Sequence, residues 1–281
     1  MIIFKTASAL SEHINALHAA GKSVGFVPTM GALHQGHLSL IAASKSENNA
    51  TVCSIFINPT QFNNAEDFNL YPVTVEKDIE QLVATGCDML FLPSVAEIYT
   101  PGHIKKHYEL GALEHKLEGY FRPGHFQGVS EVVDRLLSII NADRLYLGQK
   151  DFQQCLVIKK LIEITGRQKP ELRFISTRRE DSGLAMSSRN LRLTEQERET
   201  ALVISEALHY IKQAWPTEPV NHIKEKAMVM LQQKGFVIDY IEIADAENLE
   251  PLIQYDSHKK AIALIAATLG SVRLIDNMLL N

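Results

Sequence analysis

The stretch Ser23–His37, which reads SVGFVPTMGALHQGH, decides the fold class of this 281-residue chain. Its first part, Ser23–Pro28, is a short apolar run that predicts a buried β-strand ending in a turn. The chain then passes into Gly36–Ser46, where apolar residues recur with the period of a helix. A strand that leads at once into a helix is the repeating unit of a parallel α/β sheet.

The same alternation of strand and helix continues well beyond this stretch. Short apolar runs predict further strands at Ala50–Ile57, Cys87–Leu92, Arg144–Leu147 and Leu172–Thr177. Stretches of helical period predict helices between them, at Val75–Ala84, Val129–Ile140 and Asp151–Thr165. No internal repeat or low-complexity segment interrupts the pattern. We therefore expect an α/β fold built on a Rossmann-like parallel sheet.

The pattern changes near Arg178. A predicted helix at Thr194–Trp215 opens with TEQE, a capping box in which Thr194 and Glu197 satisfy each other's backbone N–H groups. A second helix and three strands in succession follow, at Val220–Lys234, Val237–Ile243, Ala261–Thr268 and Ser271–Asp276. We predict a Rossmann-like domain over residues 1–177 and a smaller α+β carboxy-terminal domain over residues 178–281.

Composition narrows the class of protein. The chain is 46% hydrophobic and 22% charged, so it can fill a sizeable core and is not a candidate for disorder. Its net charge of −5 and pI of about 6.1 argue against a broad basic surface for nucleic acid. A local pocket for an anion remains compatible with this charge.

Segment lengths and cysteine usage bear on location. Met1–Ser11 lacks the apolar stretch of a signal segment, and Ala261–Leu269 is too short to span a bilayer. Cys53, Cys87 and Cys155 are far apart, with no pair at metal-ligand spacing, and each has apolar neighbours. We expect three buried, reduced thiols in a cytoplasmic protein with no membrane partner.

The first chemical motif follows the first predicted strand. Gly31 and Gly36 allow close backbone approach, and free N–H groups at a helix start favour a phosphate. His34 and His37 can present two imidazoles to the same anion, or they can be exposed polar caps. The His-x-Gly-His arrangement resembles that of the nucleotidyltransferase superfamily, which includes the class I aminoacyl-tRNA synthetases. By itself it indicates only that a nucleotide is transferred or attached.

Further polar motifs follow other predicted strands. Asn58 and Gln61 carry amides suited to hydroxyl and carboxylate groups, although NPTQ can also be an ordinary turn. Lys150 offers a charge to phosphates at a helix start, or forms a solvated cap with its neighbour. Gln154 lies one helical turn after Lys150 and hence on the same face.

Two more segments carry donors. Ser187, Ser188 and Arg189 supply two hydroxyls and a guanidinium, which suit the spread charge of a phosphoryl transition state, or they belong to a plain loop. The segment 121–126, FRPGHF, can form a mobile wall over a site or an ordered turn.

Taken together, these segments closely resemble the pantothenate synthetase family, in the same order and over nearly the whole chain. The matching stretches are PTMGALHQGH, FINPTQF, FRPGHFQGV, GQKDFQQ, LAMSSRN and the late GSVRLIDNM. The resemblance implies a ligase that uses ATP and Mg²⁺ to activate pantoate as an acyl-adenylate and then joins it to β-alanine. It also implies a homodimer formed through the larger domain, with the smaller domain closing over the ATP site.

The resemblance assigns roles to individual residues. His37 would be the proton donor, and His34, Lys150, Ser187, Ser188 and Arg189 would stabilise the transferring phosphate. Gln61 and Gln154 would hold pantoate, with Asn58 nearby and Gln61 also near β-alanine. No residue is assigned to Mg²⁺. The residues expected to bind ATP are Met30, Gly31, Ala32, Leu33, His34, Gln35, Gly36, His37, Gly148, Gln149, Lys150, Asp151, Arg178, Met186, Ser187, Ser188 and Arg189.

The chain departs from the family pattern at a few positions. Gln149 stands where the family more often has Glu, and Ser182 stands where it usually has Asp. Arg178 replaces an apolar residue whose backbone would face adenine, a contact that tolerates the exchange. Asn69–Val73 lacks the arginines that often flank its Tyr-Pro pair.

Three other functions are compatible with the first motif. A nucleotidylyltransferase would keep the nucleotide in its product, but it gives no reason for Gln61, Gln154 or the serine–arginine loop. A nucleotide sensor would bind ATP without turnover, which the intact His34, His37 and Lys150 disfavour. An RNA-binding synthetase fragment is disfavoured by the acidic charge of the chain.

Overall fold

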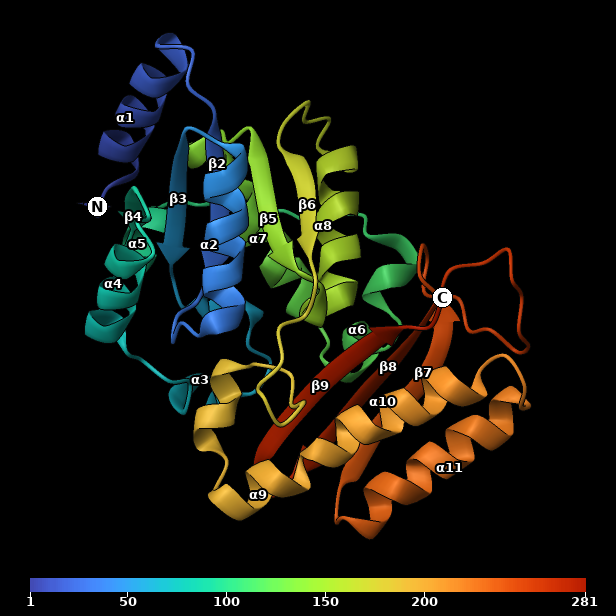
Figure 1. The fold of residues 1–281 in the computed structure, drawn as a ribbon. Helices are drawn as coiled ribbons and strands as arrows, with labels where there is room; N and C mark the ends of the chain where they lie inside the picture. Colours follow the sequence, from blue (N-terminus) through green and yellow to red (C-terminus); the bar gives the residue numbers. More distant parts are fainter.

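The larger part of the molecule is built on a parallel sheet of six strands, in a computed structural model that describes residues 1–281 (Figure 1). The order across the sheet is β1-β4-β3-β2-β5-β6. All five pairings between neighbouring strands are parallel. The strands are β1 (Ile2–Phe4), β2 (Val24–Thr29), β3 (Ala50–Ile55), β4 (Met89–Phe91), β5 (Arg144–Gly148) and β6 (Glu171–Ile175).

Helices cover both faces of this sheet. The helices α1 (Ala7–Ala19), α7 (His125–Ile140) and α8 (Phe152–Ile164) share one hydrophobic core with it. The helices α2 (Gln35–Glu47) and α4 (Val75–Ala84) pack in a second core on the other side. From β2 the chain proceeds to β3 on one side and later to β5 on the other. This reversal makes the carboxyl ends of β2 and β5 the expected place for a ligand.

The carboxy-terminal part has its own sheet and core. Its antiparallel sheet has the order β7-β8-β9, from β7 (Val237–Asp245), β8 (Ala261–Leu269) and β9 (Val272–Leu279). The helices α10 (Leu202–Ala214) and α11 (Val220–Gln233) lie along this sheet and bury Trp215 in a separate core (Figure 1). The expected fold class, a Rossmann-like parallel sheet followed by a smaller α+β unit, is confirmed.

Short elements connect these layers. They are the helices α3 (Ala65–Asn69), α5 (Val95–Ile98), α6 (Glu118–Phe121) and α9 (Glu195–Thr200), and the 3₁₀ turns η1 (Pro59–Gln61), η2 (Gly111–Glu114), η3 (Gln149–Asp151) and η4 (Ser188–Arg192).

The structure corrects the sequence predictions at several points, and it adds the helix α1, which was not predicted. The single helix expected at Thr194–Trp215 is divided at Ala201, where the Ile204 N–H bonds to the Ala201 carbonyl three residues back. Strand β1 was not predicted, because it is a three-residue edge strand whose side chains are largely exposed. The capping box of Thr194 and Glu197 is present, and the three cysteines are buried and free.

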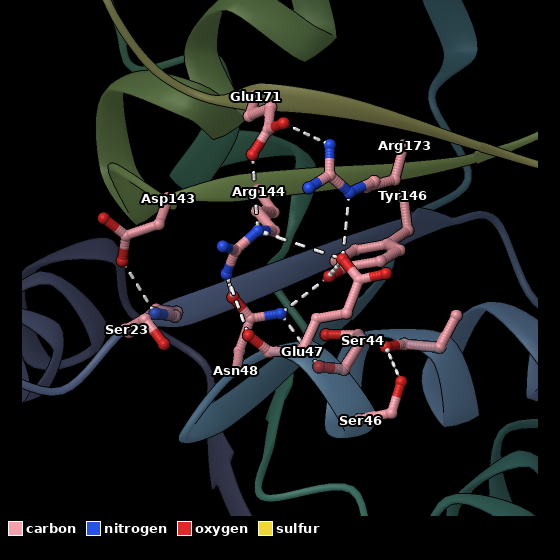
Figure 2. Close-up of polar contacts among 12 residues, drawn as sticks. Ser23, Ser44, Ser46, Glu47, Asn48, Asp143, Arg144, Tyr146, Glu171 and Arg173 are labelled. Carbon is pink, nitrogen blue, oxygen red and sulfur yellow. Dashed lines mark hydrogen bonds and ion pairs between the residues drawn. The ribbon is translucent and has the colours of Figure 1, made fainter.

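The carboxyl end of α2 is anchored to the sheet by a polar network (Figure 2). The Tyr146 hydroxyl donates to Glu47 Oε2 at 2.9 Å, and Arg173 Nε donates to the same oxygen at 2.9 Å. Arg144 Nη1 donates to Asn48 Oδ1 at 3.0 Å, just after the helix. These contacts join the end of α2 to β5 and β6, and so fix the position of its amino terminus at the opposite edge of the sheet.

A glycine in β2 allows α2 to pack this closely. A Cβ atom at Gly25 would overlap Ser44 Oγ and Asn48 Nδ2. Neither side chain can move freely, because Ser44 Oγ is hydrogen-bonded to Thr51 Oγ1 and Asn48 Nδ2 donates to the Tyr146 hydroxyl.

We expect Gly25→Ala to lower the free energy of unfolding by about 1–3 kcal/mol, because the added methyl group overpacks the α2–β2 contact. Urea unfolding checks this value. The matched control is Gly148→Ala, at a residue with φ of −80° and no atom within 4 Å of an added Cβ. The control should stay within about 0.5 kcal/mol of the unchanged protein. Equal stability of both variants would show that the contact is not tight.

Candidate active site

Two adjoining cavities lie where the carboxyl ends of β2, β3 and β5 face the carboxy-terminal part. The first measures about 210 Å³ and the second about 300 Å³. Five residues line both: Arg122, Lys150, Asp151, Ser187 and Arg189. The first cavity brings together most of the predicted site, namely Met30, His34, Gly36, His37, Asn58, Gln61, Gly148, Lys150, Asp151, Gln154, Arg178, Met186, Ser187, Ser188 and Arg189.

Five predicted ATP-binding residues do not line this cavity: Gly31, Ala32, Leu33, Gln35 and Gln149. Ala32 and Leu33 are buried, and Leu33 belongs to the core beneath α2. Gln35 is exposed on the first turn of α2. The carbonyl of Gln149 accepts a hydrogen bond from Asn277 Nδ2 at 2.9 Å. These residues shape the loops around the cavity.

The loop between β2 and α2 is held by distant side chains that bind its backbone groups. Gly31 has φ of +72°, and a Cβ there would lie 2.8 Å from Asp78 Oδ2 and 3.1 Å from Ile55 Cγ2. The N–H of Leu33 donates to Asp78 Oδ1 at 2.8 Å. The hydroxyl of Tyr71 donates to the Gly31 carbonyl at 3.0 Å. Only glycine fits the position of residue 31 without displacing these neighbours.

The two histidines at the start of α2 are oriented by backbone groups. His34 Nδ1 accepts from the Gly36 N–H at 3.1 Å, and His37 Nδ1 accepts from the His34 N–H at 3.3 Å. The ring centroids are 4.0 Å apart. Because each Nδ1 is an acceptor, each neutral imidazole carries its proton on Nε2. Both rings can therefore donate an N–H to a ligand in the cavity.

Burial and nearby charge keep both imidazoles neutral. Burial, together with the neighbouring His37 and Lys150, lowers the pKa of His34 to about 2. Burial and the Lys150 ammonium lower the pKa of His37 to about 4. In the protein without ligand, His37 is thus a hydrogen-bond donor that holds no extra proton near neutral pH.

Lys150 stands between the two cavities. Its side chain is 18% exposed, and its ammonium lies 3.7 Å from Asp151 Oδ1. Asn277 Nδ2 in β9 donates to the Lys150 carbonyl at 2.7 Å, so the carboxy-terminal sheet holds the turn that carries the lysine. Gln154 follows in α8 and lines the first cavity.

The two serines of the serine–arginine loop have different hydrogen-bond partners. The Ser188 hydroxyl is buried and donates to the carbonyls of Ala32 at 2.8 Å and Gly31 at 3.2 Å. In the protein without ligand, its proton is thereby committed to the loop after β2. Ser187 Oγ accepts from the Arg189 N–H at 3.3 Å, which leaves its own proton for a ligand.

Arg189 is paired with a carboxylate that the sequence motifs did not include. Its Nη2 lies 2.7 Å from Asp67 Oδ2, and its Nε lies 3.2 Å from Asp67 Oδ1. Arg192 Nη1 donates to the same carboxylate at 3.0 Å. The Arg189 guanidinium also lies 5.6 Å from the centroid of the Tyr71 ring. The Asp67 carboxylate and the Tyr71 ring therefore hold the Arg189 guanidinium in place where it lines both cavities.

Arg122 and His125 are also functional candidates that the residue assignments missed. His125 Nδ1 lies 2.7 Å from the Gln61 carbonyl, and its Nε2 lies 3.1 Å from Arg122 Nη1. A carbonyl only accepts, so Nδ1 carries the proton of His125. Burial and Arg122 lower the pKa of His125 to about 3. The segment FRPGHF forms an ordered turn that joins α6 to α7 and places Arg122 in the lining of both cavities. The arginine in this motif was the feature of the sequence that could have identified it.

The amides of Asn58 and Gln61 differ in what they can reach. Asn58 is 1% exposed, and both ends of its amide are hydrogen-bonded inside the protein. It lines the cavity without a free polar atom for a ligand. Gln61, in η1, is half-buried and faces Met30 across the cavity wall.

Two further observations concern the binding of metal ions and the crossing of a membrane. No group of three or more His, Cys, Asp or Glu side chains is placed to hold a metal ion. The carboxylate of Asp151 lines both cavities beside Lys150. None of the helices has the length and apolar character needed to cross a membrane.

Comparison with known proteins gives a consistent result. A family model described as pantoate-beta-alanine ligase matches residues 2–279. A pantothenate synthetase of Cytophaga hutchinsonii is 43% identical over 289 residues, covering 100% of this chain and 99% of the relative. One of Christiangramia forsetii is 41% identical over 283 residues, covering 100% of both chains.

Solved structures agree. The pantothenate synthetase of Thermus thermophilus has a TM-score of 0.91 at 37% identity and covers 99% of each chain. The pantoate-beta-alanine ligase of Francisella tularensis, complexed with beta-gamma ATP and beta-alanine, has a TM-score of 0.84 at 36% identity. That match covers 99% of this chain and 97% of the other.

We expect His34 and His37 to remain neutral, with the proton on Nε2, from about pH 5 to pH 8 in the protein without ligand. Both pKa values lie below this window, so neither ring gains a proton within it. Imidazole ¹⁵N NMR spectra recorded across the window check the state. In urea-unfolded protein the same side chains should titrate near pH 6.5, at about the usual histidine pKa. A midpoint near that pH in the folded protein would contradict the geometry.

Proposed function

The chain belongs to the pantoate–β-alanine ligase family and is an ATP-dependent ligase that joins pantoate to β-alanine, and on that premise we propose that the reaction passes through pantoyl-adenylate. AMP and pyrophosphate would be the nucleotide products. The observation that carries this proposal is the convergence of His34, His37 and Lys150 on one cavity at the start of α2.

The chemistry requires activation of a carboxylate. A pantoate carboxylate oxygen attacks the α-phosphorus of ATP, and the bond from that phosphorus to the bridging oxygen breaks, so pyrophosphate leaves with the electron pair. The unprotonated amine of β-alanine then attacks the acyl carbon of the mixed anhydride. AMP leaves with its carboxyl-derived oxygen, and the new amide nitrogen gives up a proton.

We assign the protein groups by what they can donate. The Nε2–H groups of His34 and His37 would bind oxygens of the α-phosphate, where charge increases in the transition state. The ammonium of Lys150 and the hydroxyl of Ser187 would bind the departing pyrophosphate at the junction of the cavities. A chain with no Gly-x-x-x-x-Gly-Lys-Ser/Thr segment lacks the usual cradle for γ-phosphoryl transfer, which supports transfer at the α-phosphorus.

The rest of ATP would lie along the segment after β6. Arg178 and Met186 line the first cavity beside the two serines, and a backbone contact from residue 178 would reach adenine. The predicted ATP-binding residues that line the first cavity, among them Met30, Gly36, Gly148 and Asp151, remain part of the proposed ATP site. Gly31, Ala32, Leu33, Gln35 and Gln149 contribute through backbone geometry.

The pantoate site would lie between two amides and an apolar wall. Gln61 and Gln154 supply polar side chains, and Val129, Val132 and Leu136 line the same cavity. Pantoate carries a carboxylate, two hydroxyls and a pair of methyl groups, so a surface of mixed polarity suits it. Asn58 would act by holding Gln61 in place.

Mg²⁺ would bind mainly to ATP. Mg²⁺ is usually held by one or two carboxylates together with phosphate oxygens and water, and Asp151 is the carboxylate at the junction where the phosphates would lie. The ion would neutralise charge on the departing pyrophosphate.

We also propose a homodimer formed through residues 1–177 and a cytoplasmic location. Reduced, buried Cys53, Cys87 and Cys155 suit a reducing compartment. The smaller unit, residues 178–281, would close over ATP. Contacts such as Asn277 to the Lys150 carbonyl and Ser188 to the Ala32 carbonyl already join it to the site.

Pyrophosphate exchange tests the proposal. Labelled pyrophosphate should enter ATP when pantoate is present and β-alanine is absent, because the first half-reaction is reversible and needs no amine. Omission of pantoate should abolish exchange. Release of ADP and phosphate, retention of AMP in the final product, or a strict need for β-alanine would each exclude the adenylate route.

His37→Ala and Lys150→Ala should each lower kcat by about 10²–10³-fold, the usual loss when one preorganised donor to a charged transition state is removed. Steady-state AMP release by purified, folded variants measures the effect. His222→Ala, at an exposed residue of α11, serves as the control and should retain full activity. Near-normal turnover of both site variants would remove these residues from the mechanism.

A further inference from the structure

Behind the wall that carries Gln61 lies a chain of hydrogen bonds that leads away from the cavity. Tyr99, directly after α5, donates its hydroxyl to Asn58 Oδ1 at 2.9 Å. Asn58 Nδ2 in turn lies 3.3 Å from Gln61 Oε1. Tyr99 is not one of the residues that line the cavity.

The orientation of the Asn58 amide is fixed from both ends. Its oxygen accepts from the Thr60 N–H at 3.3 Å and from the Thr60 hydroxyl at 3.0 Å, as well as from Tyr99. Its nitrogen donates to the Gly128 carbonyl at 3.1 Å. A flipped amide would set its N–H₂ against a backbone N–H and its oxygen against a carbonyl, so only this orientation satisfies the neighbours.

The fixed amide of Asn58 determines the orientation of the Gln61 side-chain amide. The N–H of Asn58 occupies Gln61 Oε1, so the Gln61 N–H₂ group points the other way, where it contacts Met30 Sδ at 2.8 Å. A thioether is a weak acceptor that a ligand oxygen can replace. Gln61 therefore offers the cavity a donor, suited to a carboxylate or hydroxyl oxygen.

The backbone of η1 is held independently of Tyr99. A Cβ on Gly128 would overlap the Thr60 carbonyl, and His125 binds the Gln61 carbonyl. The Tyr99 hydroxyl also lies 3.2 Å from Thr60 Oγ1, so its removal would leave the backbone of the turn in place and loosen the side chains of Asn58, Thr60 and Gln61.

The ring of Tyr99 is itself held in a polar cluster. The Arg135 guanidinium lies 5.8 Å from its centroid, and the His103 ring lies 5.4 Å away. Arg135 Nη1 bonds to His103 Nδ1 at 2.9 Å, and His103 Nε2 lies 2.8 Å from Glu131 Oε1. The phenol is thus placed by packing that does not depend on its hydroxyl.

We propose that Tyr99 is a positioning residue for pantoate, which acts through Asn58 to keep the Gln61 N–H₂ group directed into the cavity. The inference rests on the proposed pantoate site. Without the Tyr99 hydroxyl, the Asn58 oxygen keeps only its two bonds from Thr60, so the Asn58 amide holds its orientation less firmly. The Gln61 amide then spends more time with its oxygen, and not its N–H₂ group, toward the substrate oxygen.

The test is Tyr99→Phe in the full-length enzyme, which removes one oxygen atom and keeps the ring. The KM for pantoate should rise by about three- to tenfold, the loss typical of one neutral hydrogen bond, while the KM for ATP stays unchanged. The matched control is Tyr108→Phe. That buried phenol donates to Asp134 Oδ2 at 3.0 Å outside the active-site cavities, so its loss should leave both KM values unchanged.

A double-mutant cycle separates positioning from a general loss of structure. Gln61→Ala should raise the KM for pantoate, and Tyr99→Phe should add nothing further in that background. Gln61→Glu should raise this KM more than Gln61→Ala, because a carboxylate would repel the substrate oxygen that the amide attracts.

The outcomes distinguish the two proposals. If Gln61→Ala raises the KM for pantoate while Tyr99→Phe alone changes nothing, Tyr99 has no positioning role and the pantoate site stands. Additive effects of Tyr99→Phe and Gln61→Ala would likewise overturn the inference. A pantoate KM unchanged by Gln61→Ala would contradict the proposed pantoate site and the inference together.

Discussion

The carbonyls of Gly31 and Ala32 receive hydrogen bonds from both halves of the molecule at the point where the chemistry is expected. Tyr71 approaches Gly31 from the segment before α4, and Ser188 approaches both carbonyls from the carboxy-terminal side. These bonds, with Asp78 on the Leu33 N–H, fix the path of the loop into α2. The orientation of His34 and His37 depends on that path, because their Nδ1 atoms accept backbone N–H groups of the same turn.

Most of the cations that line the cavities lie beside a carboxylate. Arg189 and Arg192 share Asp67, and Lys150 lies beside Asp151. Burial would raise the pKa of Glu118, but Arg273 and Arg122 outweigh it and lower that pKa to about 2, so Glu118 stays ionised. The histidines contribute no positive charge. At Arg122, Lys150 and Arg189, ATP would therefore meet cations that already have a carboxylate partner. Its phosphates would compete with these carboxylates for the same N–H groups.

Much of this arrangement could be predicted from sequence, and the remainder could not for identifiable reasons. Strand and helix periods predicted β2, α2 and β5, and the motifs after β2 and β5 line one cavity at the carboxyl ends of these strands. Periodicity does not report the direction of a side chain within a turn. The sequence therefore did not show that Ser188 faces the Ala32 carbonyl or that the amide of Asn58 is committed within the protein. Asp67 and Tyr99 lie outside the recognised motifs and reach the site only through tertiary contacts.

The central claim is that pantoate attacks the α-phosphorus of ATP, and isotope transfer tests it most directly. Pantoate labelled with ¹⁸O in its carboxylate should give, after complete turnover with ATP and β-alanine, AMP that carries one labelled oxygen on phosphorus. The ¹⁸O shift in the ³¹P spectrum of AMP reports this transfer. Unlabelled AMP, or label in inorganic phosphate, would contradict the account and would leave the fold unaffected.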